Sequence, residues 1–511
     1  MKEEQGLQKD KPEMSVNRQI AKGAAWMVAF KMLDRSIAVV STVVLARMLA
    51  PHDFGIVGMA MILLAALNLL VSFGFDVQLI QNAKAGRDEF DTAWTFSVMF
   101  SVACAVVLVL LAGPAAAFYR EPQLEAVIYV LALAFALEGF SNIGTVAFRR
   151  EMRFDREFKF LLSKRAANLL VTIPLAVYLR NYWALVIGQL AGTILSVSLS
   201  YVVSTYRPRL SLKARVEMFH TSKWLMVNNF FQFIHNRASS FLLARTAGAQ
   251  WVGIWSISAE IANLPTNELV APVNRAAFPG YARVAHDLPA LRDSFLKVIA
   301  SVGLVSIPCG VGIVVVADLL VPAALGWKWM AAIPVIQLLA ISGVIKALQT
   351  NITYIYLALG LVKRITIIWC VQIAIMLAIL IPSVLAYGVM GAAWSSLATA
   401  CLMIPVNQSL VAKSLSLDGT AFLRELVRPL LAAGAMAAAV LTVKSQLVLR
   451  HETLDHVLAL LLCVAVGGLV YVTAIWVLWR MSAERGGMER YGFLKLQSML
   501  GKAGIRLRLV D

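Results

Sequence analysis

Charged residues are scarce in this chain. Lys, Arg, Asp and Glu make up 15% of its 511 residues and hydrophobic residues 60%, with a mean hydropathy of +0.75. A soluble domain carries about 25% charged and roughly 45–50% apolar residues. A water-soluble fold of this composition would expose more apolar surface than water tolerates. The composition therefore excludes an ordinary soluble protein and predicts a chain that lies mostly within a membrane.

The sequence also lacks the residue patterns of metal sites, disulfide frameworks and common enzymes. Its five cysteines lie in apolar stretches without metal-ligand or disulfide spacing, and we interpret them as small buried hydrophobic residues. It has no Walker A, GxGxxG or HExxH motif and no serine-centred nucleophile elbow. No short apolar segment with a small-residue cleavage site opens the chain, which predicts that the first apolar span is retained. We therefore expect no enzyme, no metal and no cofactor.

Long apolar stretches recur along the whole chain. A helix needs roughly 20 mostly apolar residues to cross a bilayer. The sequence therefore predicts an all-α integral membrane protein with about fourteen transmembrane helices, near residues 21–48, 55–82, 92–113, 124–147, 158–179, 182–204, 221–246, 251–281, 294–317, 331–359, 365–386, 388–412, 428–447 and 456–479.

Positive charge is distributed unevenly between the connections. The even-numbered connections and both tails hold thirty-two Lys and Arg residues, and the odd-numbered connections hold seven. Cytoplasmic loops are enriched in these residues, so both termini are expected in the cytoplasm of a bacterial inner (plasma) membrane. The net charge of +17 then fits membrane lipids as partners and requires no nucleic acid. Asp88, Glu89 and Asp91 after the second span are interpreted as a solvated loop.

Two distant segments match without gaps at an offset of 198 residues: Trp26 with Trp224, Leu45-Ala46-Arg47 with Leu243-Ala244-Arg245, and Gly55 with Gly253. Six helices separate the copies, so both have the same orientation, as in transporters built from parallel repeats. The expected organisation is a cytoplasmic tail (1–20), an N-terminal six-helix bundle (21–204), a basic cytoplasmic linker (205–220), a C-terminal six-helix bundle (221–412), a cytoplasmic loop (413–427), two appended helices (428–479) and a basic cytoplasmic tail (480–511).

Lys31, Asp34 and Arg35 lie on one face of the first predicted span. An ionised side chain at the centre of a membrane helix costs roughly 2.5–3.5 kcal/mol, so the three together would oppose insertion into lipid by about 7–10 kcal/mol. They are expected to face a watery cavity or one another. A pair of Asp34 with Lys31 or Arg35 that only fixes packing is the alternative.

Later spans carry polar stripes as well, such as Glu260, Asn263 and Asn267 in the eighth span. We expect these faces to line one central cavity between the two halves. The basic residues within the spans outnumber the acidic ones, which favours an anionic cargo group such as a phosphate or diphosphate. These basic residues are Lys31, Arg35, Lys164, Arg165, Arg237, Arg275 and Lys346.

Asp34 and Glu260 are the candidates for coupling transport to protons or Na⁺. His235 is interpreted as an interior histidine with satisfied hydrogen bonds, with titration during transport as the alternative. Three prolines at seven-residue intervals in the eighth span predict either a static kink or a bending element: Pro265, Pro272 and Pro279.

The sequence resembles the polysaccharide (O-antigen or exopolysaccharide) flippases of the multidrug/oligosaccharidyl-lipid/polysaccharide exporter superfamily. The resemblance is carried by LARMLAPHDFGIVGMA (45–60), after a helix beginning KGAAW, and by FGFDVQLIQ (73–81) and AFRREMRFDREF (147–158). It implies two six-helix bundles around a central cationic cavity, with two further C-terminal helices. The family's cavity-facing basic residue in the first helix falls on Arg35 or Lys31.

The resemblance further implies a flippase that moves an undecaprenyl-diphosphate-linked oligosaccharide from the cytoplasmic to the periplasmic leaflet. Its implied partners are this polyprenyl-diphosphate-linked cargo, membrane lipids, and polysaccharide polymerase and assembly proteins. A lipid II flippase or a multidrug exporter of the same fold is an alternative, although a cationic cavity disfavours drug cations. A polymerase or ligase, or a scaffold in polysaccharide assembly, is a further alternative, and the short connections leave no room for a catalytic domain.

Overall fold

The computed structural model describes residues 16–71, 78–80, 82, 85–151, 153–418, 420–447 and 452–481. Every regular element in these ranges is helical, so the prediction of an all-α protein is confirmed. Within the same ranges, nine helices are long and apolar enough to cross a membrane, or ten if one bent pair forms a single span. The count of about fourteen spans stays a prediction. Most of both predicted tails lies outside the described residues.

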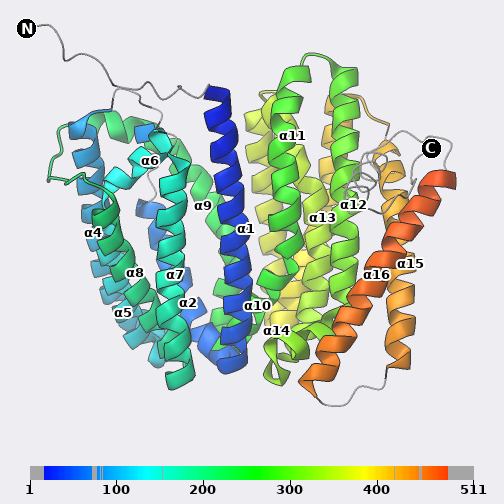
Figure 1. The fold of residues 1–511 in the computed structure, drawn as a ribbon, viewed down its shortest axis with the longest axis horizontal. Coiled ribbons are helices and arrows are strands. Elements are labelled where there is room, and N and C mark those ends of the chain that lie inside the picture. Colours follow the sequence, from blue (N-terminus) through cyan, green and yellow to red (C-terminus); the bar gives the residue numbers. More distant parts are fainter. Residues whose placement is uncertain are drawn as a thin grey trace, which may run out of the picture. The chain divides into compact units, whose positions relative to one another are not determined.

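The first half of the chain forms α1 (Val16–Met48), α2 (Pro51–Val71), α4 (Arg87–Tyr119), α5 (Gln123–Gly139), α6 (Ala147–Arg150), α7 (Phe154–Leu179) and α8 (Trp183–Val203) (Figure 1). At the start of α4, the Glu89 carboxylate accepts a hydrogen bond from the Gly86 backbone N–H at 2.9 Å, which satisfies a donor that the helix cannot. α4 packs against α5, and α7 packs against α8.

The second half forms α9 (Arg215–Thr246), α10 (Ala249–Ala262), α11 (Ala271–Val284), α12 (Leu288–Leu320), α13 (Ala332–Ala358), α14 (Val362–Leu415), α15 (Ala421–Gln446) and α16 (Thr453–Met481). At 54 residues, α14 would be about 80 Å long if straight, against roughly 30 Å of bilayer core. Gly388, with φ +57°, divides it into two arms. They correspond to the predicted spans 365–386 and 388–412.

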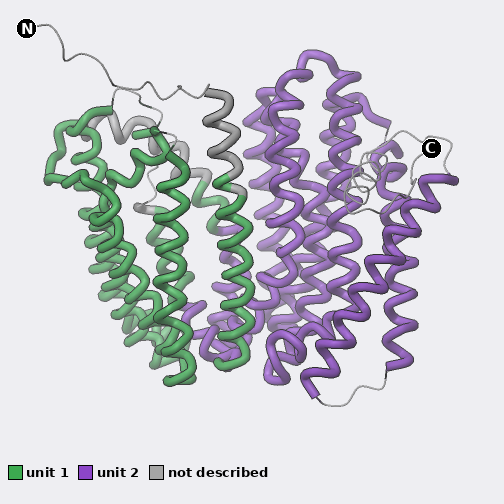
Figure 2. The backbone as a smooth tube through the Cα atoms, viewed as in Figure 1, with its two compact units in different colours: residues 1–49, 60–233 green, residues 50–59, 234–511 purple. Residues whose placement is uncertain are grey.

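The chain divides into two compact units (Figure 2). Unit 1 comprises residues 1–49 and 60–233, and unit 2 comprises residues 50–59 and 234–511. The core of unit 2 includes Phe295, Tyr356 and Leu415, from α12, α13 and α14. α15 and α16 both pack against α12, and an ion pair of 2.6 Å between Lys444 and Asp318 joins α15 to α12.

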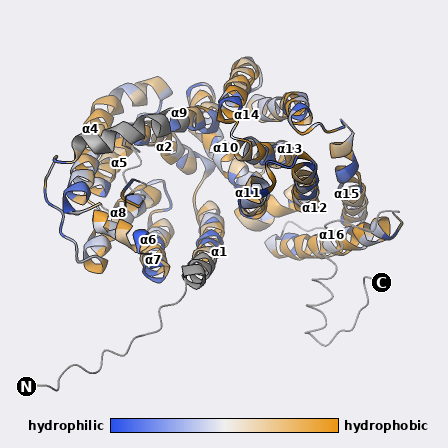
Figure 3. Ribbon diagram, turned by 90° about the horizontal axis from the view of Figure 1, so that it is seen from above, coloured by the Kyte–Doolittle hydropathy of each residue, from blue (hydrophilic) through white to orange (hydrophobic). Residues whose placement is uncertain are grey.

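Many helices expose apolar side chains to their surroundings. Leu110, Leu170 and Leu469 are 70%, 75% and 68% exposed. Hydrophobic residues predominate along α16, whereas α6 and α11 carry hydrophilic patches (Figure 3). Outward-facing leucines at this exposure fit helices that are surrounded by lipid and not by water.

The helix boundaries follow the internal repeat. α1 ends at Met48 and α9 at Thr246, while α2 begins at Pro51 and α10 at Ala249, so both pairs of boundaries are 198 residues apart. The two copies also touch inside unit 2. A Cβ atom on Gly55 would lie 1.7 Å from the carbonyl oxygen of Ala249, and one on Gly253 would lie 1.9 Å from that of Pro51. Each contact is the other's equivalent under the repeat, so α2 and α10 meet in a self-complementary crossing.

Two predicted spans are interrupted in the structure. The span predicted at 251–281 is not continuous: α10 ends at Ala262, a π-helical turn covers Thr266–Val270, and α11 follows. Proline lacks a backbone donor, and Pro265 lies directly before the π-helical turn. The span predicted at 124–147 ends earlier, with α5 at Gly139, and the following segment Ile143–Arg150 bends away by 64°. A bending role for the prolines stays a prediction.

Asp91 is buried, so the solvated-loop interpretation of its cluster is wrong for this residue. Its side chain is held by the extended segment that follows α8: Asp91 accepts hydrogen bonds from the Tyr206 hydroxyl at 2.7 Å and the Arg209 backbone N–H at 2.8 Å. Burial and the hydrogen bond to Asp91 raise the pKa of Tyr206, which keeps this hydroxyl a donor at neutral pH. Asp91 therefore fixes the start of the predicted linker to α4.

Asp91→Asn is expected to loosen this segment, because the amide loses the charge that strengthens both hydrogen bonds. Trypsin cleavage after Arg209 and Lys213 in membrane vesicles should become at least about threefold faster, a change that corresponds to roughly 0.7 kcal/mol. Asp88→Asn is the matched control for cleavage after Arg209, since Asp88 lies in the same helical turn but is exposed and, among the described residues, pairs with Lys213 at 3.6 Å and not with Arg209. Equal cleavage in the two variants would contradict the role assigned to Asp91.

Candidate functional site

In unit 1, charged residues of three helices form ion pairs. Asp34 of α1 lies 3.3 Å from Arg165 of α7, and Lys164 of α7 lies 3.3 Å from Glu138 of α5. From the sequence alone, the expected partners of Asp34 lie on its own helix. The sequence did not predict an ion pair between α1 and α7, because the rotation of α1 against α7 is not encoded in either helix alone. Lys31 is exposed and Arg35 is half-buried on the same helix.

Variants of the Asp34–Arg165 pair can distinguish a packing role of Asp34 from a role in transport. Both side chains are more than one-third exposed, Asp34 at 40% and Arg165 at 34%, so solvent screens the pair. Asp34→Arg alone is expected to lower the amount of protein in the membrane, because it places two like charges together. The exchanged variant, Asp34→Arg with Arg165→Asp, is expected to restore that amount. If the exchanged variant recovers both the amount of protein in the membrane and transport, the pair has a packing role. If the amount of protein recovers but transport stays low, Asp34 or Arg165 faces the cargo or a coupling ion.

Unit 2 contains a polar cavity of about 280 Å³. Three of the predicted site residues, Asn263, Asn267 and Lys346, line it, and His235 of α9 lines it as well. Four hydroxyl groups complete the lining: Ser239, which lies on the same polar stripe of the seventh predicted span as His235, and Ser395, Ser396 and Thr399 of the second arm of α14, which the sequence did not single out. Three of these four residues lie on one arm of α14, at positions i, i+1 and i+4. Because Ser and Thr are tolerated in any membrane helix, this spacing is only a weak sign of a binding site.

In the described part of the chain, the Lys346 ammonium contacts a hydroxyl group and no carboxylate. Its ammonium donates to the Ser396 hydroxyl at 2.8 Å, and Ser342 lies 3.0 Å from the same hydroxyl oxygen. None of the described cavity-lining residues is Asp or Glu. The charge of Lys346 is therefore available to an anion that enters the cavity.

Three buried polar atoms of the cavity have no hydrogen-bond partner among the described residues: His235 Nδ1, Ser395 Oγ and Thr399 Oγ1. The interpretation of His235 as fully satisfied is thus not supported at Nδ1; its ring packs edge-on against Trp369 at 5.3 Å. A buried polar group without a partner costs about 1–3 kcal/mol. Three together in one cavity are suited to a ligand that carries several oxygen atoms.

Other predicted site residues lie elsewhere. Arg237 on α9 and Arg275 on α11 are exposed, and Arg275 donates to the Ala271 carbonyl at 3.4 Å. Glu260 is half-buried on α10. None of these three is among the described residues that line the cavity around Lys346.

Unit 2 also has an apolar groove of about 670 Å³. α12, α15 and α16 form most of it, and its lining includes the carboxylate residue Glu268. Its walls are aliphatic and include Ile313, Val316, Leu320, Val440, Leu461 and Val464. The groove is suited to a hydrocarbon chain.

Long apolar helices with a polar, cationic cavity inside one unit define a multi-pass membrane protein of the transporter class. The sequence profile of the polysaccharide biosynthesis protein family matches residues 44–334, and the chain belongs to this family. The resemblance found in the sequence is thereby confirmed.

Curated relatives point the same way. The lipopolysaccharide biosynthesis protein WzxC of Escherichia coli (strain K12) is 25% identical over 68% of this chain and 71% of its own length. The succinoglycan biosynthesis transport protein ExoT of Rhizobium meliloti (strain 1021) is 22% identical over 91% of this chain and 94% of its own. The teichuronic acid biosynthesis protein TuaB of Bacillus subtilis (strain 168) is 23% identical over 90% and 95%.

Solved structures share the fold. The lipid II flippase MurJ in an inward closed conformation aligns with a TM-score of 0.72 at 10% identity, covering 88% of this chain and 98% of MurJ. An inward-facing multidrug resistance MATE family transporter of the MOP superfamily aligns with a TM-score of 0.54 at 12% identity, covering 75% and 95%. At these identities the likeness shows the fold alone.

Proposed function

We propose that this protein is a flippase for undecaprenyl-diphosphate-linked oligosaccharide repeat units. It moves them from the cytoplasmic to the periplasmic leaflet of the bacterial inner membrane by alternating access, for lipopolysaccharide or exopolysaccharide biosynthesis. The observation that carries the proposal is the cavity around Lys346, a cationic and hydroxyl-lined space in a chain of the polysaccharide biosynthesis protein family.

The cavity offers what a phosphate-linked sugar needs to leave water. The Lys346 ammonium compensates phosphate charge, and Ser395, Ser396 and Thr399 exchange hydrogen bonds with phosphate oxygens or sugar hydroxyls. The polyprenyl chain stays in lipid or in the apolar groove of unit 2. One lysine in place of several arginines keeps binding weak enough for release on the other side.

The remaining assignments belong to the same proposal. Both termini lie in the cytoplasm, polymerase and assembly proteins receive the cargo, and the protein transports without catalysing a reaction. Lys31, Arg35, Lys164, Arg165, Arg237 and Arg275 bind cargo in other steps of the cycle. Asp34 and Glu260 couple it to protons or Na⁺.

The test follows lipid-linked repeat units in cells depleted of this protein. Units in each leaflet are counted by their accessibility to a glycosidase or lectin added to the periplasm. The proposal expects intact units to accumulate on the cytoplasmic side while surface polysaccharide is lost. Expression of the full chain restores both, and the peptidoglycan precursor keeps its normal distribution throughout.

Two other outcomes would replace the proposal. Units that reach the periplasm normally but stay unpolymerised would indicate a polymerase, ligase or scaffold function. Accumulation of the peptidoglycan precursor instead of the repeat unit would indicate a lipid II flippase of the same fold.

A further inference from the structure

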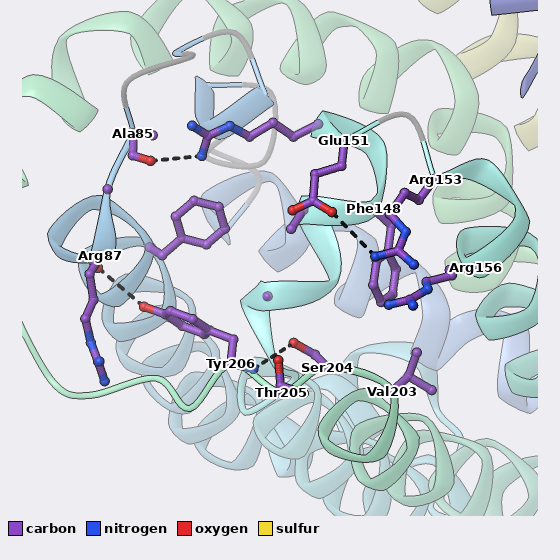
Figure 4. A pocket seen from close by; sticks show the side chains of 15 residues that line it. Ala85, Arg87, Phe148, Glu151, Arg153, Arg156, Val203, Ser204, Thr205 and Tyr206 are labelled. Carbon is purple, nitrogen blue, oxygen red and sulfur yellow. Dashed lines mark hydrogen bonds and ion pairs between the residues drawn. The ribbon is translucent and has the colours of Figure 1, made fainter. Parts of the chain in front are cut away.

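A further pocket lies in unit 1, at the end where α4 and α7 begin and α8 ends (Figure 4). Its volume is about 450 Å³, within the range of roughly 300–1,000 Å³ that small-molecule sites occupy. Among the residues that the structure describes, five charged ones line it and one of these is acidic: Arg87, Arg150, Glu151, Arg153 and Arg156.

The arginines of this pocket are only partly neutralised. Glu151 approaches Arg153 at 3.9 Å, the limit of an ion pair. Arg150 donates to the Ala85 carbonyl at 2.8 Å, which orients its guanidinium. Arg156 is exposed and has no side-chain partner among the described residues. Arg87 shares the carboxylate of Asp91, at 3.6 Å, with the linker.

The neighbouring Arg149 differs from these residues. It pairs with the buried carboxylate of Glu157 and does not line the pocket. The segment 147–158 therefore uses one arginine to fix its own fold and directs three others to the cavity. An excess of positive charge at the cytoplasmic surface needs only exposed basic residues. It does not require them to gather around a concave site.

The other walls of the pocket are aromatic. Phe90, Phe148 and Tyr206 line it, and the Arg150 guanidinium lies over the Phe90 ring at 5.9 Å. Figure 4 shows Tyr206 and Arg87 on one side of the space and Arg153 and Arg156 on the other. A group bound in this space meets the guanidinium groups of Arg153 and Arg156 on one side and the ring of Tyr206 on the other.

We propose that this pocket binds a phosphate or diphosphate group. Planar guanidinium forks match phosphate oxygens in pairs, and partly desolvated arginines beside aromatic rings bind them more strongly than arginines in open water. The site lies entirely within unit 1, whereas the cavity around Lys346 lies in unit 2. It does not rest on the proposed transport function.

The test uses the full chain in an uncharged detergent at constant ionic strength, with inorganic pyrophosphate as the probe. Thermal unfolding at increasing pyrophosphate concentrations gives an apparent Kd. We expect a saturable stabilisation that Arg153→Ala with Arg156→Ala weakens at least about tenfold in Kd, since two charge-assisted contacts are lost. Lys159→Ala is the matched control, because Lys159 is exposed on the same helix and does not line the pocket. It should change Kd by less than about twofold.

Arg156→Lys provides a second comparison if the double variant does not fold. It keeps the charge but loses the planar fork, so it should bind pyrophosphate more weakly than the unchanged chain. An equal loss of binding in Lys159→Ala, or no saturable binding at all, would overturn the proposal, because either result means diffuse surface charge.

A second set of binding measurements, with lipids added, identifies the source of the phosphate group. Micelles containing phosphatidylglycerol are compared with micelles containing phosphatidylcholine. Competition of phosphatidylglycerol with pyrophosphate, absent in the double variant, supports the site and assigns it to a lipid head group. Saturable pyrophosphate binding without competition supports the site and assigns it to a free or terminal diphosphate.

Discussion

Alanine in place of Gly55 or Gly253 is expected to remove most of the folded protein. A Cβ atom at these positions would lie 1.7 Å or 1.9 Å from a carbonyl oxygen of the opposite helix, far inside contact distance. Backbone cannot rotate away as a side chain does, so α2 and α10 must separate. Overpacking of a core costs about 1–3 kcal/mol and more where backbone must move, so a loss of at least about 3 kcal/mol is expected from either change. This loss of stability is measured as the decrease in the fraction of protein that stays monodisperse after heating in detergent.

Gly468→Ala is the matched control. Gly468 lies within α16, and a Cβ atom there meets no neighbour within 4 Å. This change should be neutral or stabilising by a few tenths to about 1 kcal/mol, because alanine loses less backbone entropy in a helix. The double variant at Gly55 and Gly253 should lose less than the sum of the single losses, since the first change already opens the shared crossing. Additive or negligible losses would mean that the two helices do not meet there.

Lys346→Met is expected to lower the rate of cargo flipping by roughly 10- to 100-fold, from about 1.5–3 kcal/mol for a hydrogen bond to a charged group. Methionine keeps most of the length of the apolar side chain and removes the ammonium group, with its charge and its hydrogen bond to Ser396. The measurement is the transfer of lipid-linked oligosaccharide across reconstituted vesicles, at equal amounts of protein.

Two variants separate a cargo contact from a structural effect. Lys346→Arg keeps the charge and should retain more activity than Lys346→Met. Lys363→Met removes an exposed lysine near the start of α14 and should leave the rate within about twofold. An unchanged rate in Lys346→Met would exclude the cavity of unit 2 as the phosphate site. Depletion of the whole protein would still test flipping itself.

Much of the fold was predictable, because the local sequence is sufficient to identify a membrane helix. The lipid interior requires a long apolar stretch for each crossing helix, and α7, α8 and α13 follow their predicted spans closely. The repeat was visible for a related reason. Gly55 and Gly253 are fixed by a backbone contact that excludes every side chain, so the same residue recurs in both copies.

The breaks were harder to predict than the spans. Pro265 and Pro272 signalled a disturbance of the eighth span, but the sequence does not say whether proline bends a helix or ends it. The structure ends α10 at Ala262 and continues through a π-helical turn. Asp91 was misinterpreted for a similar reason. Its carboxylate can accept several hydrogen bonds, and the donors belong to Tyr206 and Arg209, which lie more than a hundred residues away in the sequence.

By itself, the sequence indicated that this chain is helical, lies in the membrane, contains a repeat and resembles the polysaccharide flippases. Each of these properties depends on residues close together in the chain or on matching stretches. Only the tertiary structure decided which polar groups meet. It brought Lys346 to Ser396 and the hydroxyls of α14, paired Asp34 with Arg165, and left Arg237 and Arg275 outside the cavity of unit 2. The physical reason is that periodicity fixes which residues share a helix face, whereas the packing of all neighbouring helices fixes where that face points.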